Sequence, residues 1–167
     1  MPLSFKHPGS WNRQEAGINV VFSPADGALT SLFSQKGTGD SWSQVREVIG
    51  GDGDKAIGLA TSFSSTLVDV STPEQIKASL QGLLPANATF TSGPEQLLVG
   101  GYAADQVEGD LTDPADPANK LHFRAVVVQV QRPDPRTVYL VFFAPLSSFD
   151  SKRGLFDQVQ ASANFLA

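Results

Sequence analysis

Apolar and polar residues alternate, or apolar residues form short runs, along most of the chain, and both patterns predict β-strands. In residues 18–24, alternate apolar side chains share one face before a proline ends the strand. Residues 138–143 are apolar on both faces, which is typical of a central strand covered on each side. Further strands are predicted over the ranges 3–8, 28–34, 88–90, 97–102, 121–131 and 137–144, with one more somewhere within 56–70.

Three segments instead repeat their apolar residues every three to four positions, which predicts helices. The sharpest local signal is Thr72-Pro73-Glu74-Gln75, where threonine and glutamine form a capping box and proline takes the first helical position. This predicts a helix over 72–84, which Pro85 ends. The other helices are expected over 41–49 and, as a long C-terminal helix, over 148–166.

The links between the predicted strands are short, so we expect antiparallel pairing and an α+β fold with an antiparallel sheet packed between helices. Residues 50–54 consist of Gly and Asp, and residues 105–119 are polar with four Asp and one Glu, so both segments are expected to be loops. Asp26-Gly27 suits a tight hairpin turn, and Gly100-Gly101 indicates a bulge or a close backbone approach. Internal repeats are absent from the sequence, so residues 1–167 are expected to form a single domain.

The composition excludes several classes of protein. The 167 residues include no cysteine, which excludes disulfides, cysteine-ligated metal centres and a thiol nucleophile. The 17 acidic residues outnumber the 12 Lys and Arg, so a nucleic-acid partner is not expected. No apolar run approaches the roughly 18 residues of a transmembrane segment. Residues 1–5 lack signal-peptide features, so a cytoplasmic location is expected unless a leader has been removed, which would make the protein extracytoplasmic.

Two sets of motifs stand near the ends of the chain. The first comprises Ser4-Phe5-Lys6-His7-Pro8, Trp11 and Gly17-Ile18-Asn19-Val20-Val21-Phe22. The second comprises Thr137-Val138-Tyr139-Leu140-Val141 and then Phe156, Val159, Ser162 and Phe165 in the terminal helix. Together they resemble the PsbP/Mog1-like family over about the first 24 and the last 50 residues, whereas residues 35–70 do not align.

The resemblance implies an antiparallel sheet sandwiched by helices and a non-catalytic binding role. Members of the family include an extrinsic photosystem II subunit, a nuclear-transport cofactor that binds the Ran GTPase, and many bacterial proteins of unknown role, often exported lipoproteins. The lipobox cysteine of an anchored member is missing from this sequence. The resemblance transfers a fold and a way of acting, but no particular ligand.

The signals for metal ions and cofactors are weak. Residues 50–55 resemble one calcium nonapeptide repeat, but Lys55 stands where that motif needs an acid. The acidic residues within 105–116 could hold a cation only if this segment folded back on itself, and its Asp-Pro pairs favour turns instead. We therefore expect no metal ion and no cofactor.

Histidine and its charged neighbours are the remaining candidates. Any imidazole chemistry must use His7 or His122. His122 shares one face of its strand with Arg124, and we expect this face to meet solvent or line a groove. Basic residues follow directly after the acidic segment, as they would in a charge-complementary docking face. The candidate interaction surface comprises His122, Arg124, Arg132, Arg136, Asp110 and Asp113.

The sequence therefore predicts a non-enzymatic binding or accessory module with a protein partner. Two other functions stay open. One is a small-molecule hydrolase or lyase that uses His122 and a neighbouring carboxylate in a cleft between the sheet and the C-terminal helix. The other is a carrier of a hydrophobic small molecule, with some of the 11 phenylalanines lining a cavity instead of filling a core.

Overall fold

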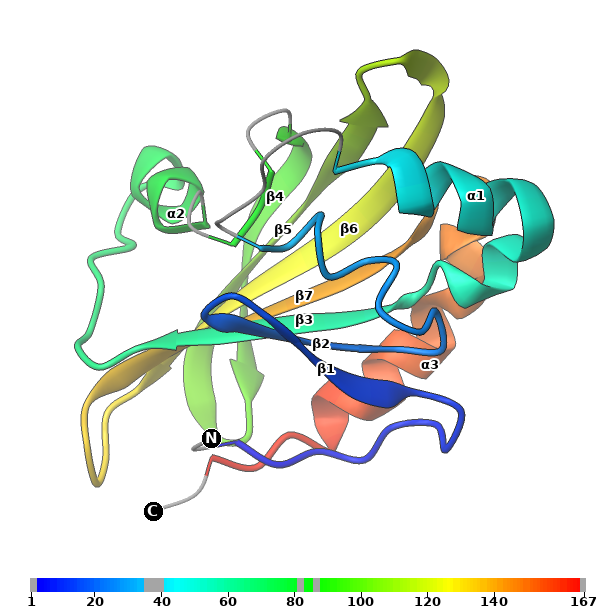
Figure 1. Ribbon diagram of the computed structural model, residues 1–167. Helices are drawn as coiled ribbons and strands as arrows, with labels where there is room; N and C mark the ends of the chain where they lie inside the picture. Colours follow the sequence, from blue (N-terminus) through cyan, green and yellow to red (C-terminus); the bar gives the residue numbers. More distant parts are fainter. Residues whose placement is uncertain (1–2, 35–40, 81–82, 86–87, 166–167) are drawn as a thin grey trace.

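The computed structural model describes residues 3–34, 41–80, 83–85 and 88–165 (Figure 1). In chain order the elements are β1 (Asn12–Ala16), β2 (Asn19–Ser23), α1 (Ser43–Asp52), the short 3-10 helix η1 (Gly53–Lys55), β3 (Gly58–Ser64), α2 (Pro73–Leu80), β4 (Ala88–Val99), β5 (Tyr102–Asp113), β6 (Asp116–Val130), β7 (Arg136–Pro145) and α3 (Phe149–Ala161). Among these described residues, no helix is long and apolar enough to cross a membrane.

The seven strands form one sheet in the order β1-β2-β3-β7-β6-β5-β4, and every neighbouring pair is antiparallel. Helices α1 and α2 lie on one face of the sheet, and α3 covers the other (Figure 1). The fold is therefore the α+β sandwich that the sequence predicts.

Strand β7 lies at the centre of the sheet and is buried over all ten of its residues. Alternate side chains enter two separate cores, because successive residues of a strand point to opposite faces. Val141 and Phe143 pack on the side of α1 and α2, whereas Leu140 and Phe142 pack against α3. The continuous apolar run in the sequence is explained by this two-sided burial.

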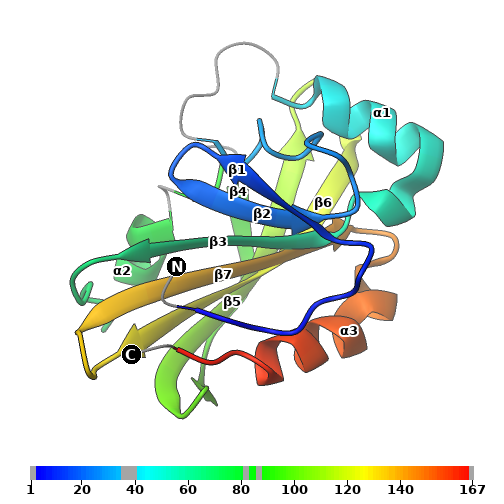
Figure 2. The same cartoon turned by 60° about the horizontal axis from the view of Figure 1, so that its bottom comes forward.

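The two ends of the described chain lie side by side just beyond the C-terminal end of α3 (Figure 2). The backbone of Ser4 exchanges two hydrogen bonds with that of Asn164, at 2.9 and 2.8 Å. Nearby, the Phe165 ring packs edge-on against Tyr102. A Cβ on Gly100 would lie 2.8 Å from that phenylalanine ring, which confirms the predicted close approach, although Gly100-Gly101 forms the β4–β5 turn.

Local signals gave the most accurate predictions. The capping box is present, with Thr72 N–H donating to Gln75 and the Gln75 N–H donating to Thr72, at 3.1 and 3.2 Å. Strands β2, β3 and β7 and helix α1 lie where they were expected, as do the described parts of α2 and α3. Both helices were predicted to end too late, because residues 83–84 are not helical and residues 162–165 follow the end of α3. Residues 81–82 and 166, which also belong to these predicted helices, lie outside the described residues.

The expected loop over 105–119 is wrong, because this segment forms most of β5 and the start of β6. Its residues Glu108 and Asp110 alternate with buried Val107 and Leu111, so it has the two-residue period of a strand. The expected break between 88–90 and 97–102 is also wrong. Strand β4 continues from Ala88 to Val99, with irregular pairing around residues 90–95.

Four smaller expectations also differ from the structure. Residues 28–34 form turns that pack on the sheet, and residues 3–8 make only the single bridge at Ser4. The glycine-rich residues 50–52 continue α1, and the rest of that segment lies in η1. Strand β1 was missed because its sequence is polar, as suits an exposed edge strand.

The packing between β5 and its neighbours predicts a strong effect at Gly109. A Cβ at this position would lie 2.6 Å from the Phe123 ring and would also collide with the Thr89 backbone. We expect Gly109→Ala to lower the free energy of unfolding by about 1–3 kcal/mol in urea titrations. In Gly154→Ala, a matched change on α3 where the added Cβ meets no atom within 4 Å, we expect stabilisation by ~1 kcal/mol. Equal effects of the two substitutions would contradict this packing argument.

Candidate functional site

His122 lies on the face of the sheet that α3 covers, between two carboxylates of the neighbouring strand. Strands β5 and β6 pair so that His122 is opposite Asp110 and Arg124 is opposite Glu108. The His122 Nδ1 atom is 2.7 Å from Asp110 Oδ1, and Nε2 is 2.8 Å from Glu108 Oε1. The carboxylates thus approach opposite sides of the ring and do not converge on one point. Within the described residues, no group of three such side chains is arranged to hold a metal ion.

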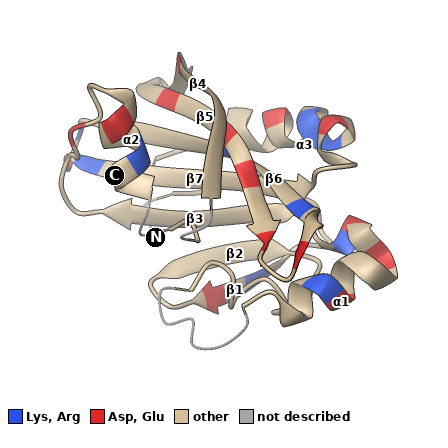
Figure 3. Cartoon of the chain, turned by 90° about the horizontal axis from the view of Figure 1, so that it is seen from above, with Lys and Arg blue, Asp and Glu red and all other residues tan. Residues whose placement is uncertain are grey.

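Helix α3 closes over this pair of strands with Arg153. The guanidinium donates two hydrogen bonds to Glu108, at 3.0 and 2.9 Å, and a third to Asp150 at 2.8 Å. It also stacks over Phe149, whose ring meets His122 edge-on with centroids 4.5 Å apart. Glu108 of β5 and Arg153 and Asp150 of α3 therefore form one continuous series of ion pairs. Figure 3 shows where the charged residues lie on these elements.

The pKa of Glu108 reflects two opposing effects. Burial raises it, whereas the hydrogen bonds and charges of Arg153 and His122 lower it, and the net pKa lies below the ordinary value. Hydrogen bonds to Glu108 and Asp150 in turn raise the pKa of Arg153. These ion pairs therefore hold Glu108 in its charged form.

Arg124 forms a second connection to α3. It is only 5% exposed, and its Nη1 donates to Asp157 at 2.7 Å and to Gln160 at 3.5 Å. The expectation that the His122–Arg124 face meets solvent or lines a groove is wrong, because α3 covers it. This face instead fixes the position of the helix.

The other three candidate residues lie elsewhere. Asp113 is fully buried at the β5–β6 turn, where Arg46 of α1 binds both of its oxygens at 2.6 and 3.1 Å. Hydrogen bonding by Arg46 lowers the pKa of Asp113 to about 2. Arg132 is exposed in the β6–β7 turn, and Arg136 beside it is 6% exposed and donates to the Asp134 carbonyl. The six candidates thus occupy three separate places and form no single surface.

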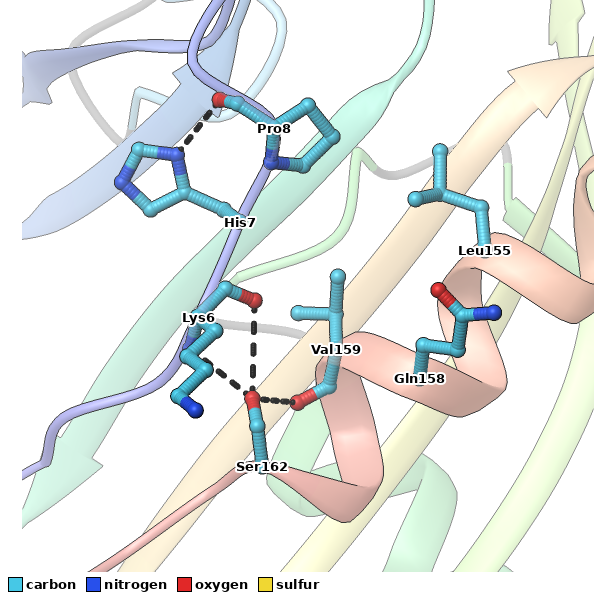
Figure 4. A pocket seen from close by; sticks show the side chains of 7 residues that line it. All are labelled: Lys6, His7, Pro8, Leu155, Gln158, Val159 and Ser162. Carbon is cyan, nitrogen blue, oxygen red and sulfur yellow. Dashed lines mark hydrogen bonds between the residues drawn. The ribbon is translucent and has the colours of Figure 1, made fainter.

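A groove lies on the other side of α3, where the N-terminal segment runs along the helix (Figure 4). The Lys6 N–H donates to Ser162 Oγ at 2.8 Å, and the same hydroxyl oxygen lies 2.7 Å from the Val159 carbonyl. These bonds hold the segment beside the end of the helix. The groove has a volume of about 350 Å³ and is lined by Lys6, His7, Pro8, Leu155, Gln158, Val159 and Ser162.

One wall of the groove rests on aromatic side chains. The His7 ring is stacked on Trp11, with centroids 6.3 Å apart and planes 11° apart, and also contacts Phe22. Its Nδ1 lies 2.9 Å from the Pro8 carbonyl and must donate, because a carbonyl oxygen only accepts. The wall is therefore fixed in position, while His7 itself stays exposed.

The groove residues were not among the site candidates from the sequence. A signal was present, because Lys6-His7-Pro8 on one wall and Val159 and Ser162 on the other belong to the motifs that carry the family resemblance. Charge patterns could not identify them, since Lys6 is the one lining residue with a permanent charge.

Comparisons with known proteins identify the fold. The structure is similar to the solution structure of PsbP from the cyanobacterium Synechocystis sp. PCC 6803, with a TM-score of 0.55 and 13% identity. The match covers 98% of this chain and 86% of that one. This chain has the PsbP-like fold.

A crystal structure of LpqN, involved in cell envelope biogenesis of Mycobacterium tuberculosis, is also similar to this PsbP-like structure. Its TM-score is 0.49 at 9% identity, over 99% of this chain and 83% of that one. No family model and no curated protein matches the sequence. The similarity to the cyanobacterial PsbP structure therefore shows the fold alone, and this is the fold that the resemblance at the two ends of the chain implied.

The ion pairs behind α3 predict unequal effects for two acidic residues that bind the same arginine. The Glu108 side chain is 16% exposed and also bonds His122, whereas Asp150 is 90% exposed. We expect Glu108→Gln to lower the free energy of unfolding by about 1.5–3 kcal/mol, and Asp150→Asn to lower it far less. Urea titration at pH 7 measures both, and equal losses would contradict the assigned role of Glu108.

The contact between Asp113 and Arg46 predicts a pH dependence of stability. Because the folded pKa of about 2 lies below the unfolded value of about 3.9, ionised Asp113 stabilises the fold above pH 4. This contribution, about 2 kcal/mol, disappears as the pH falls towards 2. We expect Asp113→Asn to be less stable than the wild type at pH 7, with a gap that narrows in urea titrations between pH 5 and 2.5. The exposed control Asp134→Asn should show no such gap, and a constant gap for Asp113→Asn would contradict the assignment.

Proposed function

We propose that this PsbP-like chain is a non-enzymatic binding or accessory module that contacts a protein partner through the groove beside α3. The groove is the observation that carries the proposal. It combines apolar side chains of Pro8, Leu155 and Val159 with exposed polar groups on Lys6 and Gln158, and an apolar centre with a polar rim is typical of protein interfaces. Its two walls are held in place by the Lys6–Ser162 bond on one side and by the ion pairs of α3 on the other.

The environment of His122 argues against its use as a catalytic base. The side chain is 12% exposed, both ring nitrogens bond carboxylates, and Phe149 packs against the ring. A general base must reach the proton that it removes from a substrate. Here Arg153 and Phe149 occupy the space between sheet and helix where a substrate would have to lie. These contacts support a structural role.

The packing of the phenylalanines argues against the carrier hypothesis. Most of them pack within the two cores on either side of the sheet, as in the contacts of Phe33 with Phe143 and of Phe142 with Phe156. The fully buried ones are Phe33, Phe123, Phe142, Phe143, Phe149 and Phe156. Side chains that fill a core in this way do not line a ligand cavity.

Site-specific photo-crosslinking tests the proposal. A photoreactive amino acid replaces Lys6 or Gln158, on opposite walls of the groove, or Gln44, which is exposed on α1 at the other face of the sheet. In cells of the source organism, we expect positions 6 and 158 to capture the same protein, at least several-fold more than position 44. Equal capture from position 44, or different proteins from positions 6 and 158, would count against the groove as the contact region.

A further inference from the structure

Lys6 is a positive charge without a counter-charge at the edge of the groove. Its side chain is exposed, and within the described part of the chain no carboxylate lies within ion-pair distance of it. The arginines that meet α1 or α3 differ, since Arg46, Arg124 and Arg153 each bind an acidic side chain. The backbone bond from Lys6 to Ser162 fixes where this charge emerges.

The helix side of the groove carries no charge to balance Lys6. Leu155, Gln158, Val159 and Ser162 are the lining residues of α3 and of the turn that follows it. The acidic residues of the helix bind arginines on its other side, as Asp157 does with Arg124. Although the whole chain has a net charge of −5, the groove itself is therefore locally positive. At physiological salt, charges more than about 8 Å away are largely screened. A group bound in the groove therefore interacts mainly with the charge of Lys6.

The open shape of the groove favours a protein segment over a free small molecule. Its volume of about 350 Å³ lies near the lower end of the range for small-molecule pockets, about 300–1,000 Å³. Small-molecule pockets of that range bury most of their ligand's surface. This groove instead lies open between two surface segments (Figure 4), where it can receive one or two side chains of a larger partner.

We infer that the partner segment filling the groove carries an acidic side chain beside an apolar one. The apolar side chain packs on Pro8, Leu155 and Val159, and the carboxylate pairs with the Lys6 ammonium, which lies towards the Ser162 end of the groove (Figure 4). The Gln158 amide is exposed on the same helix and can bond the partner's backbone. This inference rests on the proposed function, and it adds the chemistry of the partner.

Titration with three matched peptides tests the inference on the full, isotope-labelled chain. The peptides are acetylated and amidated Glu-Leu-Leu-Glu, Gln-Leu-Leu-Gln and Lys-Leu-Leu-Lys, followed by amide NMR shifts. We expect the acidic peptide to shift amides of residues 6–7 and 155–162, and to bind about two- to fivefold more tightly than the neutral one at low salt. The basic peptide should bind most weakly. Lys6→Met should abolish the preference for the acidic peptide, whereas Lys55→Met, the same charge change at a distant exposed site, should retain it.

The possible results separate the inference from the proposed function. If all three peptides shift the groove equally, or the basic one binds most tightly, the acidic character of the partner is wrong while the groove remains a binding site. Loss of the preference in Lys55→Met as well as in Lys6→Met would make it an effect of net charge, and would also overturn the inference. Shifts that avoid residues 6–7 and 155–162 for every peptide would overturn the inference and count against the groove itself.

Discussion

The burial of β7 on both faces is the constraint on which the rest of the structure depends. A strand whose ten residues are all buried must be covered by a separate layer on each side, so neither layer of helices can be lost. Helices α1 and α2 form one layer with the turns of residues 24–34, and α3 forms the other. A single 13-residue helix is narrower than a seven-stranded sheet, and the terminal segments complete the cover beside it. The groove lies where helix and terminal segment meet, so its position follows from the architecture.

The ion pairs between β5, β6 and α3 neutralise the charged groups that the helix covers. Away from β7, the α3-facing side of the sheet becomes polar at Glu108 and His122, and charged groups under a helix are unfavourable unless they are paired. Most of these groups are paired, because side-chain contacts connect Asp110 to His122, His122 to Glu108, and Glu108 to Arg153. Arg124 Nε is buried without an acceptor among the described residues, so the pairing is incomplete there. Such a network specifies the position of α3 more than it adds to net stability, and a fixed helix gives the groove a rigid wall.

The sequence predicts a feature correctly where the interacting residues lie close together along the chain. The capping box of α2 joins positions three residues apart, and the two-sided character of β7 is visible within one run, so both were predicted correctly. The acidic residues of β5 were assigned to a loop because their partners are distant. Glu108 bonds His122, 14 residues away, and Arg153, 45 residues away. Without those partners an acidic segment resembles a solvated loop, and only its alternation with Val107 and Leu111 favoured a strand.

The six candidate residues from the sequence form no single surface, and the reason is related. Some charged residues that are conspicuous in a sequence form ion pairs inside the folded protein. Here Arg124 and Asp113 are buried in ion pairs with other elements. A charge that is available to a partner can be recognised only after the internal pairs are known, because availability depends on what the rest of the chain has left unpaired. Lys6 belongs to a motif that carries the family resemblance, but its charge pattern in the sequence does not separate it from the other lysines. In the folded chain, its bond to Ser162 and the uncharged helix beside it make it the positive end of an apolar groove. The proposed binding chemistry thus depends on which charges the tertiary fold leaves unpaired, and the composition of the chain does not contain that information.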